Sequence, residues 1–362
     1  MKPNTIRMFL LLISLLLTIE IVRAENNIND PASYCVGEES KSDIQENNIV
    51  LPIRLHSGDT VGLVSSGYRA TDEAIEGAKK QIEALGLKVK TGKHIFDSLK
   101  NIFPTTNAER DFAGTDFGRA DDLSDMFKDP DVKAIFEIRG GFGSDKILDL
   151  LDYELIKNNP KIIIGFSDIT SLLLAINSKT SLITFHGPMP GAFNPWPEFT
   201  QDYLKHVLFD GEKVIFTNPE KNKIRTINSG IVKGKLVGGN FATLNSMIGG
   251  SDYLPKWEGA VLFLEDIGEN CRRMDRMMWQ LKNAGVLNKI SGFIFGNCAG
   301  ADCCPQAELD SIIDEYMKPL GIPAYSGAMI GHMLEMFTLP VGAMVEINAN
   351  NGTVAVLEDV VI

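Results

Sequence analysis

Ser167 stands at a predicted turn between a strand and a helix, a position from which a hydroxyl can act as a nucleophile. Residues 161–164 predict a buried strand, residues 165–168 a sharp turn, and from Ile169 onward apolar residues recur at helical spacing. At the N-terminus of such a helix, free N–H groups and the helix dipole favour the oxyanion that forms when a serine attacks a carbonyl. The turn has the first half of a G-x-S-x-G elbow but Ile169 in place of the second glycine. A serine that only caps the helix therefore fits the stretch as well.

A serine nucleophile needs a base and a carboxylate that orients the base. Of the chain's 5 histidines, His186 ends a predicted strand and His332 lies in a loop near the C-terminus, and α/β enzymes often carry catalytic residues in such loops. Glu265 and Asp266 end a further apolar strand, where side chains face the cleft in these folds, and Glu269 follows them. Each of these side chains also fits a purely structural role, so the spacing alone leaves the base and the carboxylate open.

A glycine-rich loop, Arg139–Gly143, follows another predicted strand. Glycines let the backbone approach a ligand closely. Phosphate binding is one interpretation, but neither a Walker lysine nor a G-x-G-x-x-G motif is present. The loop otherwise predicts N–H donors for an oxyanion, or a glycine-rich strand end without a ligand.

Strands and helices alternate up to about residue 190, which indicates an α/β fold with a parallel sheet covered on both faces. Thr71 predicts the N-cap of one of these helices, which Gly86 ends. The predicted strands are 60–65, 87–91, 134–138, 161–164 and 182–185, and the predicted helices are 72–85, 120–127, 147–156 and the helix that begins at 169.

Residues 191–224 mix proline, tryptophan, asparagine and lysine around a short predicted helix, and we interpret them as a linker. A second set of strands and helices follows: strands 230–236, 260–264 and 292–295, and helices after Asn240, at 274–284 and at 307–317. The chain ends on a predicted hairpin, because two alternating strands flank Asn350-Asn351-Gly352, which is typical of a type I′ turn.

The first 24 residues predict a signal peptide. Lys2 and Arg7 form a basic start, residues 8–19 are apolar but too short to span a bilayer stably, and Val22–Ala24 fits a cleavage site. A retained membrane anchor is the alternative. We expect export to a secreted or periplasmic location without stable membrane insertion, and we expect residues 25–48 to form a loose leader.

Charge and cysteine content limit the partners of this 362-residue chain. Its formal net charge of −12 becomes −14 without residues 1–24, which argues against nucleic acid as a partner. The number of cysteines is odd, so at least one is unpaired or intermolecular in an oxidising compartment. No cysteine and histidine spacing predicts a zinc site. The cysteines are Cys35, Cys271, Cys298, Cys303 and Cys304.

A series of short motifs resembles the LD-carboxypeptidases, serine peptidase family S66. In chain order they are Arg139–Gly143, Leu151–Tyr153, Asn159–Lys161, Gly165–Thr170, Thr184–Pro188, Gly238–Asn240, Leu264–Glu269 and Gly331-His332. Each motif is short, and eight of them in the right order are specific. The chain departs from the family at Asn270–Arg272, where proline and aromatic residues are usual, and in the tryptophan and prolines of residues 190–198.

The resemblance implies a flavodoxin-like N-terminal domain with a parallel sheet, a smaller C-terminal α/β domain and an active site between them. We expect the N-terminal domain at 49–190, the linker at 191–224 and the C-terminal domain at 225–362. By position, the family's catalytic triad falls on Ser167, Glu265 and His332. The family also implies a homodimer and no metal or other cofactor.

The family's typical substrate is a murein tetrapeptide, from which it releases the C-terminal D-Ala. One branch cleaves a peptidyl-nucleotide of the microcin C type, and a peptide-binding protein without turnover is a further alternative. The N–H groups of Asp168 and Gly141 are the expected oxyanion donors. An exopeptidase also needs a cation for the terminal carboxylate, for which Arg139, Arg273 and Arg276 are candidates.

Overall fold

The computed structural model describes residues 49–102, 109–192, 194–249 and 252–362, which lie in one compact unit. The predicted signal peptide, the predicted leader and Cys35 lie outside the described residues. Within the described part of the chain, no helix is long and apolar enough to cross a membrane.

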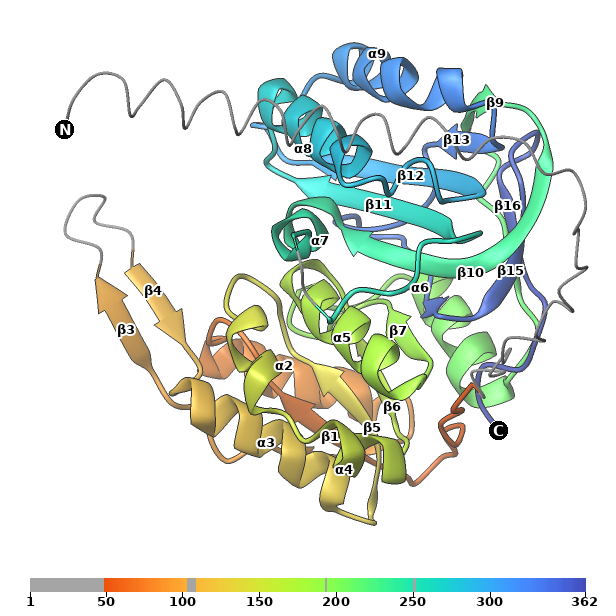
Figure 1. The fold of residues 1–362 in the computed structure, drawn as a ribbon. Helices are drawn as coiled ribbons and strands as arrows, with labels where there is room; N and C mark the ends of the chain where they lie inside the picture. The colour runs from red at the N-terminus through yellow and green to blue at the C-terminus, as the bar shows by residue number, and fades with distance from the viewer. Residues whose placement is uncertain (1–48, 103–108, 193, 250–251) are drawn as a thin grey trace, which may run out of the picture. The chain divides into compact units, whose positions relative to one another are not determined.

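The first sheet has five parallel strands, which follow one another in the spatial order β2-β1-β5-β6-β7, and the antiparallel strand β14 beside β7. Counted along the chain, the parallel strands have the order 2-1-3-4-5 of flavodoxin-like folds, so the predicted fold class is confirmed. Figure 1 shows this sheet among the red, yellow and green elements. The strands are β1 (Thr60–Val64), β2 (Lys88–Thr91), β5 (Val132–Glu137), β6 (Ile162–Gly165), β7 (Thr184–His186) and β14 (Leu339–Val341).

The central strands of this sheet are apolar on both faces, as expected for parallel strands between layers of helices. In β5 and β6, residues 134–136 and 162–164 have no exposed surface. The helices around the sheet are α2 (Asp72–Glu83), α3 (Asp116–Lys128), α4 (Tyr153–Asn158) and α5 (Thr170–Thr180). Thr71 caps α2 by accepting the N–H of Ala74 at 3.2 Å, so that predicted cap is confirmed.

The helix predicted at 147–156 is wrong as a single element. The structure has a 3₁₀ helix at Asp145–Leu150, and α4 begins only at Tyr153. The Asp152 side chain caps α4 by accepting the N–H of Leu155 at 2.9 Å. A capping carboxylate at this point starts a new helix instead of continuing the earlier one. A short hairpin of β3 (Leu99–Ile102) and β4 (Glu109–Phe112) was also not predicted, because its strands lack an apolar alternation.

The second sheet has the order β8-β16-β15-β10-β11-β12-β13-β9 and is parallel only from β10 to β13. The first half of the long strand β10 pairs with β15 and its second half pairs with β11, and Figure 1 shows it as a long curved ribbon. The strands are β8 (Ile215–Phe216), β9 (Arg225–Asn228), β10 (Ile231–Asn240), β11 (Val261–Ile267), β12 (Gly292–Ala299), β13 (Ala324–Ser326), β15 (Met344–Asn348) and β16 (Thr353–Val356). The helices that follow β7, β10, β11 and β12 are α6 (Glu198–Lys205), α7 (Phe241–Met247), α8 (Cys271–Asn283) and α9 (Gln306–Met317).

The predicted type I′ turn at the last hairpin is wrong. Asn348 pairs with Thr353, so the loop has four residues instead of two. Of the three residues Asn350, Asn351 and Gly352, only Gly352 has a positive φ, at 73°, whereas a type I′ turn needs two. The longer loop requires only one left-handed residue, and glycine supplies it.

Four of the cysteines form two disulfides. Cys271 pairs with Cys304, with their Cα atoms 4.5 Å apart, and Cys298 pairs with Cys303, with their Cα atoms 5.9 Å apart. The bonds join the loop after β12 to the start of α8 and close that loop on itself. They lie beside the end of β11, the strand that carries Glu265.

Candidate active site

Ser167 follows β6 by two residues and begins a 3₁₀ turn, Ser167–Ile169, that leads into α5. Its φ of 63° lies in the left-handed region, which a residue other than glycine rarely adopts and which costs about 1–3 kcal/mol. A Cβ added at Gly140 would lie 2.9 Å from the Cβ of Ser167 and 3.1 Å from its Oγ. The glycine loop therefore packs its backbone directly against the serine, at a position that excludes any side chain.

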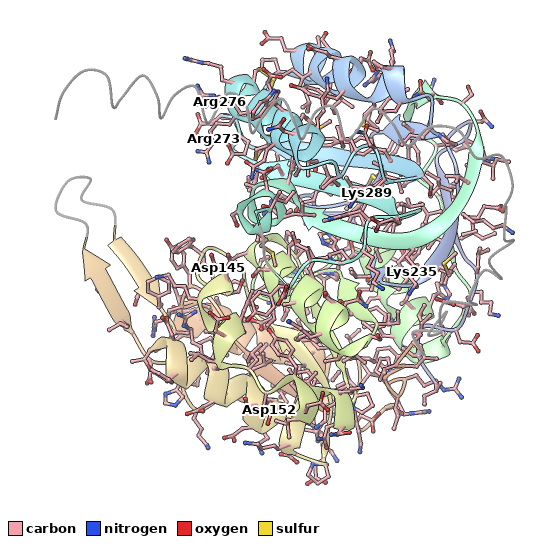
Figure 2. All side chains as sticks on the ribbon, viewed as in Figure 1. Asp145, Asp152, Lys235, Arg273, Arg276 and Lys289 are labelled. Atoms are coloured by element: carbon pink, nitrogen blue, oxygen red, sulfur yellow. A yellow bond between two sulfur atoms is a disulfide. The ribbon has the colours of Figure 1, made fainter. Side chains whose placement is uncertain are left out.

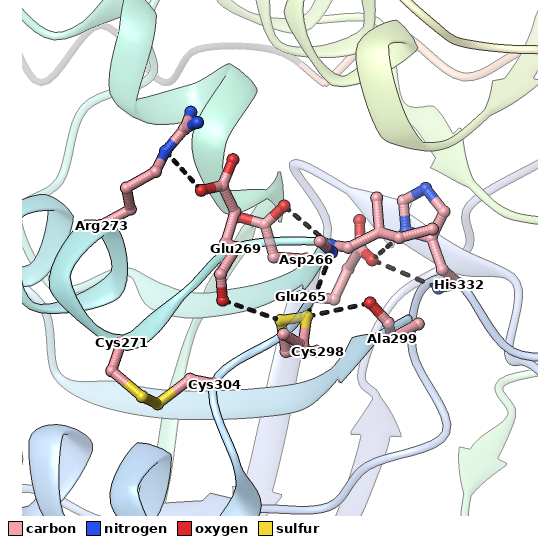
Figure 3. Close-up of a disulfide and its surroundings, with 12 residues drawn as sticks. Glu265, Asp266, Glu269, Cys271, Arg273, Cys298, Ala299, Cys304 and His332 are labelled. Atoms are coloured by element: carbon pink, nitrogen blue, oxygen red, sulfur yellow. Dashed lines mark hydrogen bonds and ion pairs between the residues drawn. A yellow bond between two sulfur atoms is a disulfide. The ribbon is translucent and has the colours of Figure 1, made fainter. Parts of the chain in front are cut away.

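His332 contacts both Ser167 and Glu265. Its Nε2 lies 3.0 Å from the Ser167 Oγ, and its Nδ1 lies 2.7 Å from the Glu265 Oε2. The backbone N–H of His332 donates to the same carboxylate oxygen at 3.2 Å, and Figure 3 shows Glu265 and His332 joined by these contacts. When Nδ1 donates its proton to Glu265, Nε2 is free to accept the proton of the Ser167 hydroxyl.

The long loop that carries His332 fits closely around Glu265. Gly331 has a φ of 99°, and a Cβ added there would lie 2.1 Å from the Glu265 Oε2. Glu265 itself is fully buried, and its strand β11 places it beside Asn240 of β10. A glycine before the histidine thus allows the backbone to reach the carboxylate.

The pKa values of the two carboxylates near the end of β11 are shifted in opposite directions. Burial raises the pKa of Glu265, but the hydrogen bond and charge of His332 outweigh it, so the pKa lies below its ordinary value. Burial raises the pKa of Asp266 to about 7. Asp266 accepts the N–H of Ala242 at 3.0 Å and the amide of Asn240 at 3.0 Å. Glu265 is therefore the carboxylate bound to a histidine, whereas Asp266 holds the start of α7.

His186 lies in the core and does not contact Ser167 or Glu265 through a hydrogen bond. Burial lowers its pKa to about 4, which keeps the ring neutral at physiological pH. The ring packs against the edges of Phe166 and Phe263, with centroid distances of 6.1 and 5.2 Å. Of the two histidines that the sequence left open, the structure brings only His332 to the serine.

Ser167 and His332 open into a cavity of about 490 Å³. Arg139, Gly140 and Gly141 form one wall, and the rest of the lining is mainly apolar. The other lining residues are Ala70, Thr71, Ala74, Phe166, Met189, Gly191, Ala192 and Ile267. A small cavity with one cation and a nucleophile suits a ligand with a carboxylate close to the bond that reacts.

Of the three candidate arginines, the structure places one beside the serine. Arg139 lines the cavity, and its guanidinium donates to the carbonyl of Arg69 at 3.2 Å. Arg273 and Arg276 are exposed on α8 (Figure 2) and do not line this cavity. The Nε of Arg273 pairs with the Glu269 Oε2 at 2.6 Å, as Figure 3 shows. The contacts thus favour Arg139 over the two arginines of α8.

Of the two predicted oxyanion donors, Asp168 follows Ser167 in the chain and Gly141 lines the same cavity. The backbone nitrogen of Asp168 lies 3.1 Å from the position that a Cβ of Gly140 would occupy, and Gly141 lines the cavity with a φ of 110°. Gly140 lies closer to Ser167 than Gly141 does. The sequence alone did not show which of the two glycines is nearer to the serine. The Asp168 side chain points into the protein, where burial raises its pKa to about 6.

Two family models match the chain. One, described as the LD-carboxypeptidase N-terminal domain, matches residues 61–187, and the other, the LD-carboxypeptidase C-terminal domain, matches residues 233–347. The chain belongs to the LD-carboxypeptidase family. It is therefore a member of a peptidase family, and the resemblance seen in its motifs is confirmed.

Relatives of this chain include proteins named for murein peptides. The probable murein peptide carboxypeptidase of Bacillus subtilis (strain 168) is 35% identical over 314 residues, which are 85% of this chain and 94% of that protein. The murein tetrapeptide carboxypeptidase of Pseudomonas aeruginosa is 27% identical over 301 residues, 80% of this chain and 93% of that protein. Among solved structures, the microcin C7 self-immunity protein MccF in its wild-type apo state has a TM-score of 0.74 and 30% identity, covering 86% of this chain and 100% of that one.

Proposed function

We propose that this protein is a serine-type LD-carboxypeptidase that releases the C-terminal D-Ala from murein tetrapeptides. The observation that carries the proposal is the chain of two contacts from Ser167 through His332 to the buried Glu265, at 3.0 and 2.7 Å. A nucleophile, a base and an orienting carboxylate in this order are the arrangement of a serine hydrolase. Family membership supports the peptidase reaction.

In the first half of the reaction, the Oγ of Ser167 attacks the carbonyl that precedes D-Ala while His332 Nε2 takes the serine proton. The ionised Glu265 holds the imidazole in the required tautomer and stabilises its positive charge. The N–H groups of Asp168 and of the Gly140-Gly141 loop stabilise the oxyanion. His332 then gives its proton to the leaving amine, so that D-Ala departs and an ester to Ser167 remains.

In the second half, water replaces the amine. His332 takes a proton from water, the resulting hydroxide attacks the ester, and the same proton returns to the Ser167 oxygen as the shortened peptide leaves. The proposed mechanism assigns no step to a metal, because His332 transfers the protons and the backbone N–H donors stabilise the oxyanion.

Arg139 is the group that we assign to the carboxylate of the terminal D-Ala. Among the described residues that line the cavity with Ser167 and His332, it is the one with a cationic side chain at neutral pH, and a guanidinium binds a carboxylate through two parallel hydrogen bonds. An exopeptidase gains its selectivity for chain ends from such a contact. Arg139→Gln should therefore raise KM for the tetrapeptide, while the Tm of the protein stays close to that of the wild type.

Mass spectrometry of murein peptides tests the proposal. The purified protein is incubated with tri-, tetra- and pentapeptides, and we expect conversion of the tetrapeptide to the tripeptide with release of D-Ala. Ser167→Ala is the matched control and should leave all three peptides intact. An unchanged tetrapeptide in the presence of folded wild-type protein would contradict the proposal.

A second candidate is the same chemistry on a peptidyl-nucleotide. The similarity to the microcin C7 self-immunity protein along almost its whole length favours it. An acyl-sulfamoyl nucleoside offered in the same assay distinguishes the two substrates by the product released. A protein that only binds peptides would differ from both, since its Ser167 would not react with a fluorophosphonate.

We also propose that the protein is exported by its N-terminal signal, is cleaved after Ala24 and acts as a homodimer. The basic start, apolar run and cleavage site of the first 24 residues support export, and the family resemblance supports the dimer. The mass of the exported protein should correspond to an N-terminus at Glu25. Light scattering of this form should give twice the mass of one chain.

A further inference from the structure

Next to the glycine loop lies a cluster of buried polar side chains that do not line the cavity and that the proposed mechanism does not use. Its members are Ser66, Arg119, Glu137, Ser144 and Asp168, each at most 6% exposed. Arg119 is only 1% exposed, and Glu137 is completely buried. Burying such groups is costly unless every contact they make is well placed, so the contacts of this cluster are informative.

Asp168 fastens one end of the glycine loop to the turn that carries Ser167. Its Oδ2 accepts the backbone N–H of Ser144 at 2.9 Å. In return, the Ser144 hydroxyl donates to the backbone carbonyl of Asp168 at 2.6 Å. Two opposed hydrogen bonds thus join the residue after the loop to the residue after the serine.

Arg119 holds the same end of the loop from the other side. Its Nη1 donates to the carbonyl of Gly143 at 2.8 Å and also to the carbonyl of Ser66, while its Nη2 pairs with Asp116. A guanidinium can bridge several acceptors in this way because its donors lie in a rigid plane. Helix α3 is thereby connected to the ends of β1 and of the glycine loop.

Glu137 fastens the start of the loop. It is the last residue of β5, and its carboxylate accepts both the backbone N–H of Ser66, at 2.9 Å, and the Ser66 hydroxyl. Ser66 is the residue whose carbonyl also binds Arg119. The segment between Glu137 and Ser144 is therefore held at both ends by buried ionisable side chains.

We propose that Arg119 and the side chain of Asp168 are positioning residues that hold the Gly140–Gly143 backbone against Ser167 as a preformed oxyanion site. The inference rests on the proposed serine mechanism. A loop with three glycines has large conformational freedom, and an oxyanion site is effective only when its donors are in place before the charge develops. The buried contacts supply this order without touching the substrate.

The test measures how fast a fluorophosphonate labels Ser167, because this reaction forms an oxyanion but needs no natural substrate. Asp168→Ala removes the acceptor of the Ser144 N–H, and we expect the labelling rate and kcat to fall about 10²-fold with KM little changed. Asp168→Asn keeps an oxygen acceptor and should recover most of the rate. Arg119→Lys keeps the charge but not the planar donors and should also slow labelling.

Asp122 provides the matched control. It is also a buried carboxylate, 4% exposed, and it accepts two backbone N–H groups, those of Lys93 at 2.8 Å and His94 at 2.9 Å. These contacts hold a loop that does not line the cavity of Ser167. Asp122→Ala should therefore lower the thermal stability, as Asp168→Ala does, but its Ser167 should be labelled at the wild-type rate.

A folded Asp168→Ala protein that is labelled at the wild-type rate would overturn the inference, as would equal slowing in Asp122→Ala. If Asp168→Ala does not fold, Arg119→Lys decides the question by the same rate. Wild-type protein that is labelled but releases no D-Ala would contradict the proposed substrate, and the comparison of labelling rates would still decide the role of Asp168.

Discussion

The nucleophile and its base are built in different ways. Ser167 lies two residues beyond β6. The glycine loop beside it follows β5, helix α5 follows β6, and both strands belong to the first sheet. His332 lies in a loop that leaves β13 of the second sheet and ends at β14 of the first. The first sheet therefore supplies most of the surroundings of the serine, with one hydrogen bond from the Asn240 N–H of β10 to the Thr170 hydroxyl, whereas the loop of the histidine is anchored in both sheets.

This difference predicts which substitutions remove a reacting group and which change the alignment of His332 with Ser167 and Glu265. Substitutions at the serine remove a reacting atom from a site that is otherwise complete. Substitutions of residues other than His332 in the loop from β13 to β14 keep every reacting group but change the distances between them. The four predictions below compare the two regions, from the largest expected effect to the smallest.

Removal of either reacting group should abolish turnover. Ser167→Ala and His332→Ala should each lower kcat on the order of 10⁶-fold, and the double variant should be little worse, because a base without a nucleophile has nothing to activate. Measurements of kcat and circular dichroism on the same samples check this. Losses that multiply in the double variant would instead mean that the two residues act in separate steps.

Glu265→Gln should have a smaller effect, on the order of 10⁴-fold in kcat. The amide keeps the shape of the carboxylate and one oxygen acceptor, but it removes the negative charge that stabilises the imidazolium and replaces one carboxylate oxygen with an NH2 donor, which can select the wrong tautomer of His332. Asp266→Asn, one residue further on, is the matched control and should cost stability more than activity, since Asp266 binds the start of α7. Equal losses of kcat in the two variants would show that Glu265 has no special role.

Gly331→Ala should misalign the base without removing any reacting group. Its Cβ would lie 2.1 Å from the Glu265 Oε2 at a φ of 99°, so the loop must move, and a shift of about 1 Å near the chemistry costs about 10²-fold in rate. Gly58→Ala is the control, because Gly58 has a φ of 91° and no atom within 4 Å of the added Cβ. It should lose stability from backbone strain alone and keep its kcat. A Gly331→Ala variant with wild-type kcat would refute the alignment role of this loop.

The stability of the two regions should depend on pH with opposite signs. Burial raises the pKa of Glu137 to about 7 from an ordinary value of 4.5, so the stability that its protonated form contributes is lost as the pH rises from about 4.5 to 7. The pKa of Glu265 is lowered, so its contribution is present at neutral pH and is lost only as the pH falls below its ordinary value.

Thermal melts between pH 5 and pH 8 separate these contributions. The wild-type Tm should fall over this range, because the three carboxylates whose pKa values are raised, Glu137, Asp168 and Asp266, together outweigh His186, whose lowered pKa acts in the opposite direction up to about pH 6.5. Glu137→Gln should flatten part of the slope, because Asp168 and Asp266, whose pKa values burial also raises, still titrate. Glu265→Gln should keep the slope. An unchanged slope in Glu137→Gln would mean that this carboxylate is ionised throughout the range.

The sequence by itself determined the elements that local pattern specifies. The strand, turn and helix around Ser167 involve residues close together in the chain, and the apolar runs of β5 and β6 are the usual sign of strands buried on both faces. The Thr71 cap of α2 follows from the hydrogen bond that a threonine makes to a nearby N–H. Motif order was also enough to assign the family, because eight short motifs in sequence rarely coincide.

Only the tertiary structure decided which distant groups meet. The contact between His332 and Ser167 joins residues 165 positions apart, and it depends on β14, a strand of three residues that is too short to predict from its pattern. The sequence could not tell His186 from His332 for the same reason. Only the folded structure shows that His186 is buried in the core and that His332 reaches Ser167. A charged residue such as Arg119 on a helix is normally expected at the surface. Its burial depends on the carbonyls of Ser66 and Gly143, which come from two distant segments, in addition to Asp116 one turn earlier on the same helix. No local pattern predicts those two carbonyls.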